Sequence, residues 1–108
     1  GALPRGLRLV HAEVVLDFAA RRAVRGDVEV AVTAREWAIL DLLASRADRV
    51  VSRFELLEGV WGEASESASG SLEVLIARLR KKLGADLIRT LRGEGYALTG
   101  GSRHGPRA

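Results

Sequence analysis

The chain has 108 residues, of which 47% are apolar and 29% charged, as expected for one soluble globular domain with a modest core. It has no cysteine, and its two histidines, His11 and His104, lie far apart in the sequence, so disulfides are excluded and we expect neither a metal site nor a cofactor. The net charge is +3, but residues 69–108 carry eight basic and three acidic groups, which favours a polyanionic partner for that part of the chain.

The first third of the sequence predicts a small antiparallel sheet. Residues 1–6 are typical of a linker or chain end. Between residues 7 and 32, the runs LRLV, EVVLDF, RAVRG and VEVAV are rich in valine and leucine and too short for helices, with turn signals at 19–22 and 26–27. No apolar run approaches the ~20 residues that span a bilayer, and no signal pattern is visible, so we expect a cytoplasmic protein without a membrane segment.

Two capping boxes predict two helices. Thr33 and Glu36 are spaced so that each side chain can bond the other's backbone N–H, and the helix that follows is predicted to reach about residue 45. Ser52 and Glu55 repeat the pattern for a helix ending near residue 60 or 61. The positions predicted to be buried are Trp37, Leu40, Leu43 and Ala44 in the first helix and Leu56, Leu57 and Val60 in the second.

A third helix is predicted to end at residue 83, after a small, polar loop over residues 62–70. Ser69 or Ser71 is expected to cap it, and Gly84 to close it. The spacing i, i+3, i+4, i+7, i+11 places one apolar stripe on a single face. That stripe consists of Leu72, Leu75, Ile76, Leu79 and Leu83.

The opposite face of the third helix is cationic. Val74, Ala77, Arg78 and Lys81 lie on it, with Arg80 and Lys82 on its flanks. Residues 78–82 carry four positive charges and no negative one, as expected of a helix that meets phosphate groups. The alternatives are a solvated surface for the face and for Lys82, and an ion pair within the protein for Arg80.

A β-hairpin is predicted to follow, because LIRTLRG and YAL flank the turn signal Glu94-Gly95. Thr90 and Arg92 lie near its turn, where an arginine can enter a minor groove or bond within the hairpin. Tyr96 is expected to pack the hairpin onto the helix. Residues 100–108 are expected to be disordered. The pattern predicts an α+β fold over residues 7–99, a winged helix-turn-helix with an N-terminal antiparallel sheet, a three-helix core and a C-terminal hairpin wing.

The sequence resembles the DNA-binding effector domains of the OmpR/PhoB family. The resemblance covers about residues 9–98 and lies in VTAREWAIL, RVVSRFELLEGVWG, LEVLIARLRKKLG and IRTLRGEGYAL, which occur in order and register. It implies a two-component response regulator, with a receiver domain attached in the full-length protein. It also implies direct-repeat DNA sites, bound as a dimer by a domain that is monomeric alone, and a contact between RNA polymerase and the loop before the third helix.

Individual roles follow from the resemblance. Arg78 and Arg80 match recognition-helix arginines, Thr90 and Arg92 match wing contacts, and Val74 matches a residue that meets thymine methyl groups. The full set of expected DNA contacts is Trp61, Ser71, Val74, Ala77, Arg78, Arg80, Lys81, Lys82, Thr90 and Arg92. For Trp61 a core position is an equal alternative. The expected polymerase contacts are Glu63, Ser65, Glu66 and Ser67, unless this loop only spaces two helices.

The sequence departs from the family at four positions. Leu75 stands where many members have histidine, Glu73 where aspartate is usual, and Gly70 and Ala77 where some have arginine. We therefore expect weaker or more dimer-dependent DNA binding than in better-endowed members.

Three functions are weighed. The leading hypothesis is sequence-specific binding of double-stranded DNA, with residues 71–83 in the major groove and residues 90–95 at the minor groove. A winged helix that only binds other proteins is the alternative, because a fold alone does not settle function. An enzyme is set aside, because the sequence has no P-loop, no GxGxxG and no plausible triad around its histidines.

Overall fold

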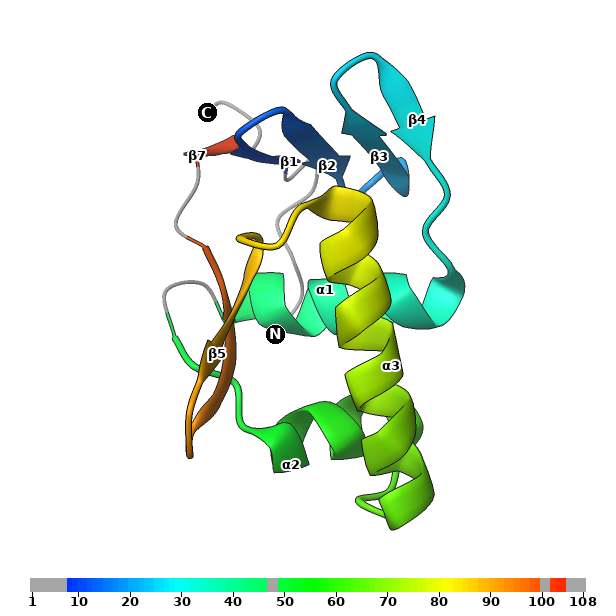
Figure 1. The fold of residues 1–108 in the computed structure, drawn as a ribbon, viewed down its shortest axis with the longest axis vertical. Helices are drawn as coiled ribbons and strands as arrows, with labels where there is room; N and C mark the ends of the chain where they lie inside the picture. Colours follow the sequence, from blue (N-terminus) through cyan, green and yellow to red (C-terminus); the bar gives the residue numbers. More distant parts are fainter. Residues whose placement is uncertain (1–7, 47–48, 100–101, 105–108) are drawn as a thin grey trace.

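The computed structural model describes residues 8–46 and 49–99, and the backbone of residues 102–104. A sheet caps one end of a helical layer, and a hairpin lies along one helix (Figure 1). In chain order the elements are β1 (Arg8–His11), β2 (Val14–Asp17), β3 (Arg22–Arg25), β4 (Val28–Val30), α1 (Ala34–Ser45), α2 (Arg53–Leu56), η1 (Leu57–Trp61), α3 (Glu66–Leu83), β5 (Ile88–Leu91), β6 (Gly95–Leu98) and β7 (Ser102–His104).

The N-terminal sheet is antiparallel, as predicted, in the order β4-β3-β2-β1-β7. Alternate residues point into the core, so that Leu9 pairs with Leu16 and Leu16 with Ala23, all three buried. Residues 102–104, within the tail that is expected to be disordered, form β7 and pair with β1. The outer edge of β1 would otherwise have unpaired backbone N–H and C=O groups. Residues 102–104 pair with this edge through their backbone, which needs no apolar side chain. Residues 1–6, 100–101 and 105–108 lie outside the described residues.

Helix α1 begins with the predicted capping box. Thr33 Oγ1 accepts from Glu36 N at 3.2 Å, and Glu36 Oε1 accepts from Thr33 N at 2.9 Å. Trp37, Leu40, Leu43 and Ala44 are buried as predicted. Trp37 also meets Phe18 of the segment after β2 in an edge-to-face contact, with ring centroids 5.6 Å apart.

The second predicted capping box forms only one of its two hydrogen bonds. Ser52 Oγ accepts from Glu55 N at 3.0 Å, but the Glu55 carboxylate accepts from Arg46 Nε at 2.9 Å instead of reaching back to Ser52. The capping box predicted there is therefore half formed. The helix continues as the π-helical turn η1 and ends at Gly62, with φ +77°. Leu56 and Leu57 are buried, and Val60 is half-buried.

Helix α3 starts earlier than predicted. Ser65, rather than Ser69 or Ser71, is the N-cap, and its Oγ accepts from Ala68 N at 3.1 Å. Ala68 is buried against the core and supplies an apolar anchor for the first turn. The prediction of a loop over residues 62–70 is therefore wrong, and the connection is residues 62–65. Gly84 closes the helix as predicted, with φ +105° and its N–H donating to Arg80 O at 2.8 Å.

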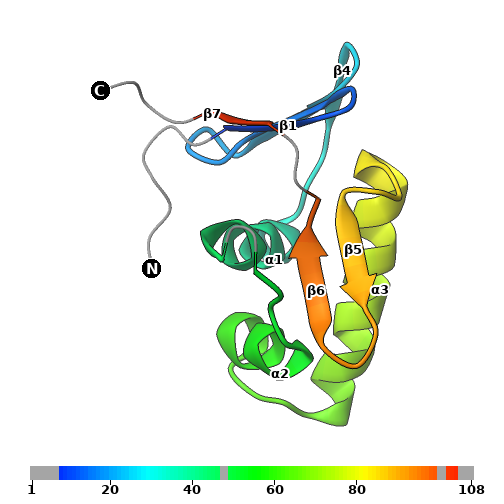
Figure 2. The same cartoon turned by 90° about the vertical axis from the view of Figure 1, so that its left-hand side faces the viewer.

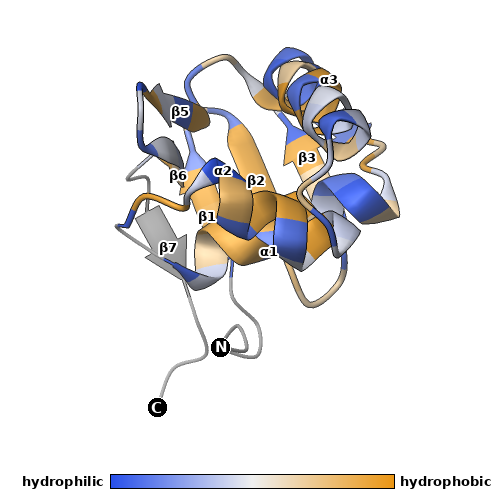
Figure 3. Cartoon of the chain, turned by 90° about the horizontal axis from the view of Figure 1, so that it is seen from below, coloured by the Kyte–Doolittle hydropathy of each residue, from blue (hydrophilic) through white to orange (hydrophobic). Residues whose placement is uncertain are grey.

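The apolar stripe of α3 is buried as predicted, except that Leu75 is half-buried. The apolar sides of α1, α3 and the strands face one another inside the molecule (Figure 3). At its end near the sheet, α3 is also held by Arg25 of β3, whose Nη1 donates to the carbonyls of Lys81 and Lys82 at 3.3 Å each. The helix is thus fixed to both the core and the sheet.

The hairpin of β5 and β6, residues 88–98, is the wing. It lies beside α3, with α1 and α2 on its other side (Figure 2). Val51, which precedes α2, pairs with Tyr96 through two backbone bonds, Val51 N to Tyr96 O at 2.7 Å and Tyr96 N to Val51 O at 2.9 Å. Tyr96, expected to pack the wing onto the third helix, is buried, and its polar contacts are with Val51 and with Arg53 of the first turn of α2.

This pairing requires a glycine at position 95. Gly95 has φ +146°, and a Cβ there would lie 2.0 Å from Val51 O. Gly95→Ala should cost at least about 3 kcal/mol of unfolding free energy, because backbone strain adds to the broken bridge. Urea denaturation followed by circular dichroism measures this.

Gly70→Ala is the matched control, because Gly70 lies inside α3 and no atom lies within 4 Å of the position that an alanine Cβ would occupy. This substitution should stabilise the domain by about 0.5–1 kcal/mol. Equal effects of the two substitutions would contradict the close approach at Gly95.

Candidate nucleic-acid interface

The exposed side of α3 carries the residues predicted for it. Ser71, Val74, Ala77, Arg78 and Lys81 are all exposed, and we call this set the recognition face. Val74 is 49% exposed although it is apolar. Among the described residues, neither Arg78 nor Lys81 uses its side chain in a hydrogen bond or an ion pair. Both charges are therefore free to meet an anion.

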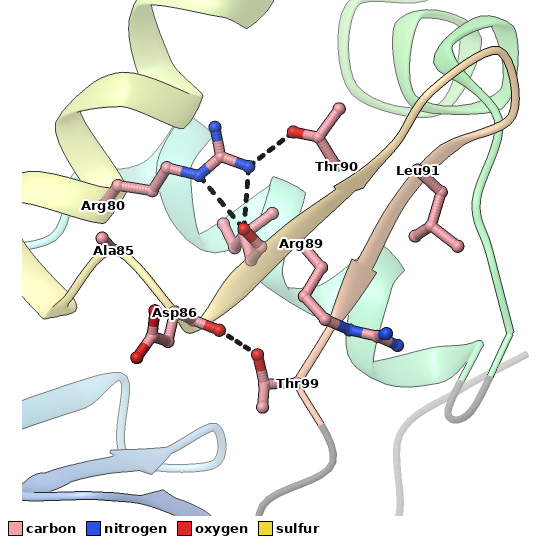
Figure 4. Close-up of a pocket in the computed structure, with 8 residues that line it drawn as sticks. Arg80, Ala85, Asp86, Arg89, Thr90, Leu91 and Thr99 are labelled. Atoms are coloured by element: carbon pink, nitrogen blue, oxygen red, sulfur yellow. Dashed lines mark hydrogen bonds between the residues drawn. The ribbon is translucent and has the colours of Figure 1, made fainter.

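Arg80 lies differently from the prediction. Its Nε and Nη2 donate to Ile88 O at 3.1 and 2.8 Å, and Nη2 also donates to Thr90 Oγ1 at 2.6 Å (Figure 4). The guanidinium is turned toward the wing and half-buried, neither placed on a flank for phosphate nor paired with a carboxylate. The physical reason is that the carbonyl of Ile88 needs a donor where the wing leans on α3.

Lys82 forms an ion pair that neither of its two interpretations included. Its Nζ lies 2.6 Å from Oε1 of Glu36, whose side chain is fully buried in α1. Burial raises the pKa of Glu36, but hydrogen bonds from Lys82 and Thr33 and the charge of Lys82 outweigh it, so the pKa of this carboxyl is lowered overall. A buried carboxylate requires a counter-charge, and Lys82, whose side chain is 29% exposed, supplies it.

The wing presents its predicted residues at the surface. Arg92 and Thr90 are exposed, and the turn is closed by Glu94 N donating to Leu91 O at 2.9 Å. Within the described part of the chain, Arg92 makes no hydrogen bond inside its own hairpin. Arg89 is a further exposed cation on β5 that the sequence reasoning did not single out, although its place one residue before Thr90 could have indicated it.

Arg53 is the main residue that the sequence reasoning missed. From the first turn of α2, its Nη2 donates to Glu73 Oε2 at 2.7 Å, to Ser69 O at 3.2 Å and to Ser69 Oγ, while its Nη1 donates to Tyr96 Oη at 3.3 Å. It thereby links α2, α3 and the wing. The negative charge of Glu73 on α3 is paired with Arg53, which reduces its repulsion of a polyanion.

The remaining predicted residues, Trp61 and the four of the polymerase-contact loop, lie between the end of η1 and the first turn of α3. Trp61 is half-buried against the core, and the guanidinium carbon of Arg35 lies 5.3 Å from its ring centroid. Of the predicted polymerase-contact loop, Glu63 lies in the connection, but Ser65 is the N-cap and Glu66 and Ser67 are in the first turn of α3. Only the assignment of these residues to a loop is wrong, because Ser65 caps the helix; Glu63, Glu66 and Ser67 are exposed, and their contact with polymerase stays a prediction.

Two features are absent from the part of the chain that the structure describes. Residues 8–46 and 49–99 hold no group of three or more His, Asp or Glu side chains arranged to bind a metal ion. Over the same ranges, no helix combines the length and apolar character that crossing a membrane requires.

A sheet, a helix–turn–helix, an exposed cationic face and an adjoining hairpin define a winged helix-turn-helix domain. The chain belongs to the family described as "Transcriptional regulatory protein, C terminal", whose sequence profile matches residues 27–98. This confirms the resemblance to the OmpR/PhoB effector domains and the predicted fold class.

Curated relatives of the chain are named response regulators. The chain is 39% identical over 97 residues to the response regulator protein PmrA of Pseudomonas aeruginosa, covering 90% of this chain and 42% of that protein. It is 36% identical over 94 residues to the response regulator MprA of Mycobacterium avium, covering 83% and 41%. The chain thus spans about two fifths of the length of these curated relatives.

Solved structures share the fold. The Klebsiella pneumoniae RstA DNA-binding domain, in complex with the RstA box, superposes with a TM-score of 0.69 and 28% identity, covering 85% of this chain and 96% of that one. The DNA-binding domain of CpxR from E. coli gives 0.68 and 30%, covering 84% and 94%. DrrB of Thermotoga maritima, an OmpR/PhoB homolog, gives 0.73 and 26%, covering 86% and 44%.

The ion pair of Lys82 with Glu36 gives a prediction on stability. Lys82→Ala should lower the unfolding free energy at pH 7 by about 3 kcal/mol, because it leaves a buried carboxylate without its counter-charge. Because folding lowers the pKa of Glu36, its stabilising contribution is present above the ordinary value of about 4.3 and is lost as the pH falls below it. Urea denaturation between pH 7 and pH 3 measures both effects.

The exposed neighbour Lys81 provides the matched control. Lys81→Ala should change stability by less than about 0.5 kcal/mol and leave the acid dependence unaltered. If Lys82→Ala were equally harmless, the pairing with Glu36 would not contribute to folding.

Proposed function

We propose that this chain is the sequence-specific DNA-binding effector domain of a transcriptional response regulator. The observation that carries the proposal is the recognition face, where Arg78 and Lys81 stay uncompensated on a helix fixed beside a wing that exposes Arg92. Helix α3 enters the major groove, with Arg78 toward base edges, Val74 toward thymine methyl groups and Arg92 at the minor groove. The likeness to a DNA-binding domain in complex with its box supports this docking.

The distribution of cations limits the affinity of one domain. Arg80 and Lys82 are used within the protein, and Leu75 and Ala77 add no charge, so fewer side chains remain for phosphate than the sequence suggests. Phosphate contacts supply most of the affinity and its salt dependence. We therefore propose that a domain that is monomeric alone binds direct-repeat sites as a dimer, where the second contact becomes intramolecular.

Two partners complete the proposal. The full-length protein would also carry a receiver domain, which the names of the response regulators support, since this chain spans about two fifths of their length. The whole regulator would act in the cytoplasm, and this domain would have no catalytic activity. RNA polymerase would meet the acidic corner formed by Glu63 and Glu66, both exposed, through a basic surface.

Arg78 tests the reading of bases. Arg78→Ala should weaken binding to a selected DNA site by roughly 1–3 kcal/mol and reduce the preference for that site over mixed-sequence duplex. Electrophoretic titration against both duplexes measures it. Arg22→Ala, at an exposed arginine of the sheet, is the matched control and should bind as the parent does. Equal losses for the two substitutions would show that only net charge matters.

Arg92 tests the wing. Arg92→Ala should weaken binding to selected and mixed sequences alike, because the minor groove offers little base information. Chemical-shift mapping with duplex DNA should move residues 71–82 and 90–95. If the sheet moved while those residues stayed still, or if no duplex bound at low salt, a protein-interaction module would be the better account.

A further inference from the structure

We propose that Arg80 is a positioning residue: it fixes the wing against α3 and thereby sets where Arg92 meets DNA. The part of this inference that concerns DNA rests on the proposed function above. The part that concerns the wing stands on the free domain alone. It departs from the expectation that Arg80, a recognition-helix arginine, contacts DNA directly.

Arg80 makes the only side-chain hydrogen bonds between α3 and β5 among the described residues. Three hydrogen bonds, of 2.6 to 3.1 Å, run from Arg80 of α3 to Ile88 O and Thr90 Oγ1 of β5 (Figure 4). Ile88 is buried at the base of the wing, and Thr90 lies two residues nearer its tip. A planar guanidinium that holds acceptors on two residues of one strand fixes that strand's direction as well as its distance.

The wing needs contacts outside the hairpin to hold its position. A two-stranded hairpin is marginally stable alone, and among the strands that the structure describes β5 pairs only with β6. The partners of the wing on the other side, the Val51 bridge and the bond from Arg53 to Tyr96 Oη, both hold β6. Arg80 is therefore the polar contact that holds β5, the strand that leads directly to Arg92.

The bonding leaves little of Arg80 for a phosphate. Nε and Nη2 are already donating and the side chain is half-buried beneath the wing, so that among the described residues only Nη1 of Arg80 has no acceptor. Both acceptors are neutral, so the positive charge persists and adds to the local potential. A positioning role and a phosphate contact consequently differ in their response to Arg80→Lys, which keeps the charge but loses the planar fork.

The first test measures the free domain. Hydrogen exchange of the amides of residues 89–97 should become about tenfold faster in Arg80→Lys, the effect of losing one charge-assisted hydrogen bond, while α1 amides stay protected. Thr90→Val, which removes the acceptor at nearly constant shape, should accelerate the same amides, and Thr90→Ser should not. Unchanged exchange of the wing in both Arg80→Lys and Thr90→Val would overturn the proposal. If Arg80→Lys also accelerates exchange of the α1 amides, the substitution has destabilised the whole domain, and the result for Thr90→Val then decides whether the contact positions the wing.

The second test measures coupling on mixed-sequence duplex. Arg92→Ala should weaken binding clearly in the parent and much less in the Arg80→Lys background, because a misplaced wing has already lost that contact. In the Lys81→Ala background, the matched control, the two losses should multiply. A phosphate contact predicts instead that Arg80→Lys binds as the parent does and that Arg92→Ala costs as much in the Arg80→Lys background as in the parent, which would overturn the proposal. If the parent binds no duplex, the proposed function fails, and the exchange measurement still decides the role of Arg80.

Discussion

The structure depends on the burial of one helix stripe. Leu72, Ile76, Leu79 and Leu83 of α3 are almost completely excluded from solvent, and each such side chain contributes about 1.5–3 kcal/mol through burial. That burial makes α3 the element against which the others are set. Polar contacts then fix its orientation: Arg53 near its N-terminal half, Arg80 along its side, and Arg25 with the Glu36–Lys82 pair at its C-terminal end. The leucines hold the helix in place, and the charged groups determine which way it faces.

The same contacts sort the four cations in the last turns of α3 into two kinds. Arg80 and Lys82 have partners inside the protein, whereas Arg78 and Lys81 project into solvent. A basic helix is therefore not a uniform electrostatic surface. Its usable charge depends on which neighbours need a donor or a counter-ion, and here a backbone carbonyl of the wing and a buried carboxylate of α1 take half of it.

Much of the fold could be predicted because its signals are local. The Thr33–Glu36 box, the valine-rich strands, the leucine stripe and the closing Gly84 all act within one turn or one strand, and the recognition face followed from helical spacing. The start of α3 was missed because small, polar residues around Ser65 suggest a loop, and burial of Ala68 depends on packing. The partners of Lys82 and Arg53 could not be foreseen for the same reason: Glu36 lies 46 residues from Lys82 in the chain, and Glu73 lies 20 residues from Arg53. The partners of Arg80 are only 8 and 10 residues away, but they depend on how the hairpin packs against α3.

The separation of the two kinds of side chain on α3 bears on redesign. Ser71, Val74, Ala77, Arg78 and Lys81 share a solvent-facing surface, and among the described residues their side chains make none of the hydrogen bonds or ion pairs that hold the domain together. These five positions could therefore be varied together in a library without breaking the side-chain contacts that stabilise the fold. The side chains at positions 73, 80 and 82 make contacts that hold α3 to its neighbours. Grafting a complete helix from a relative would therefore change these stabilising contacts together with the DNA specificity.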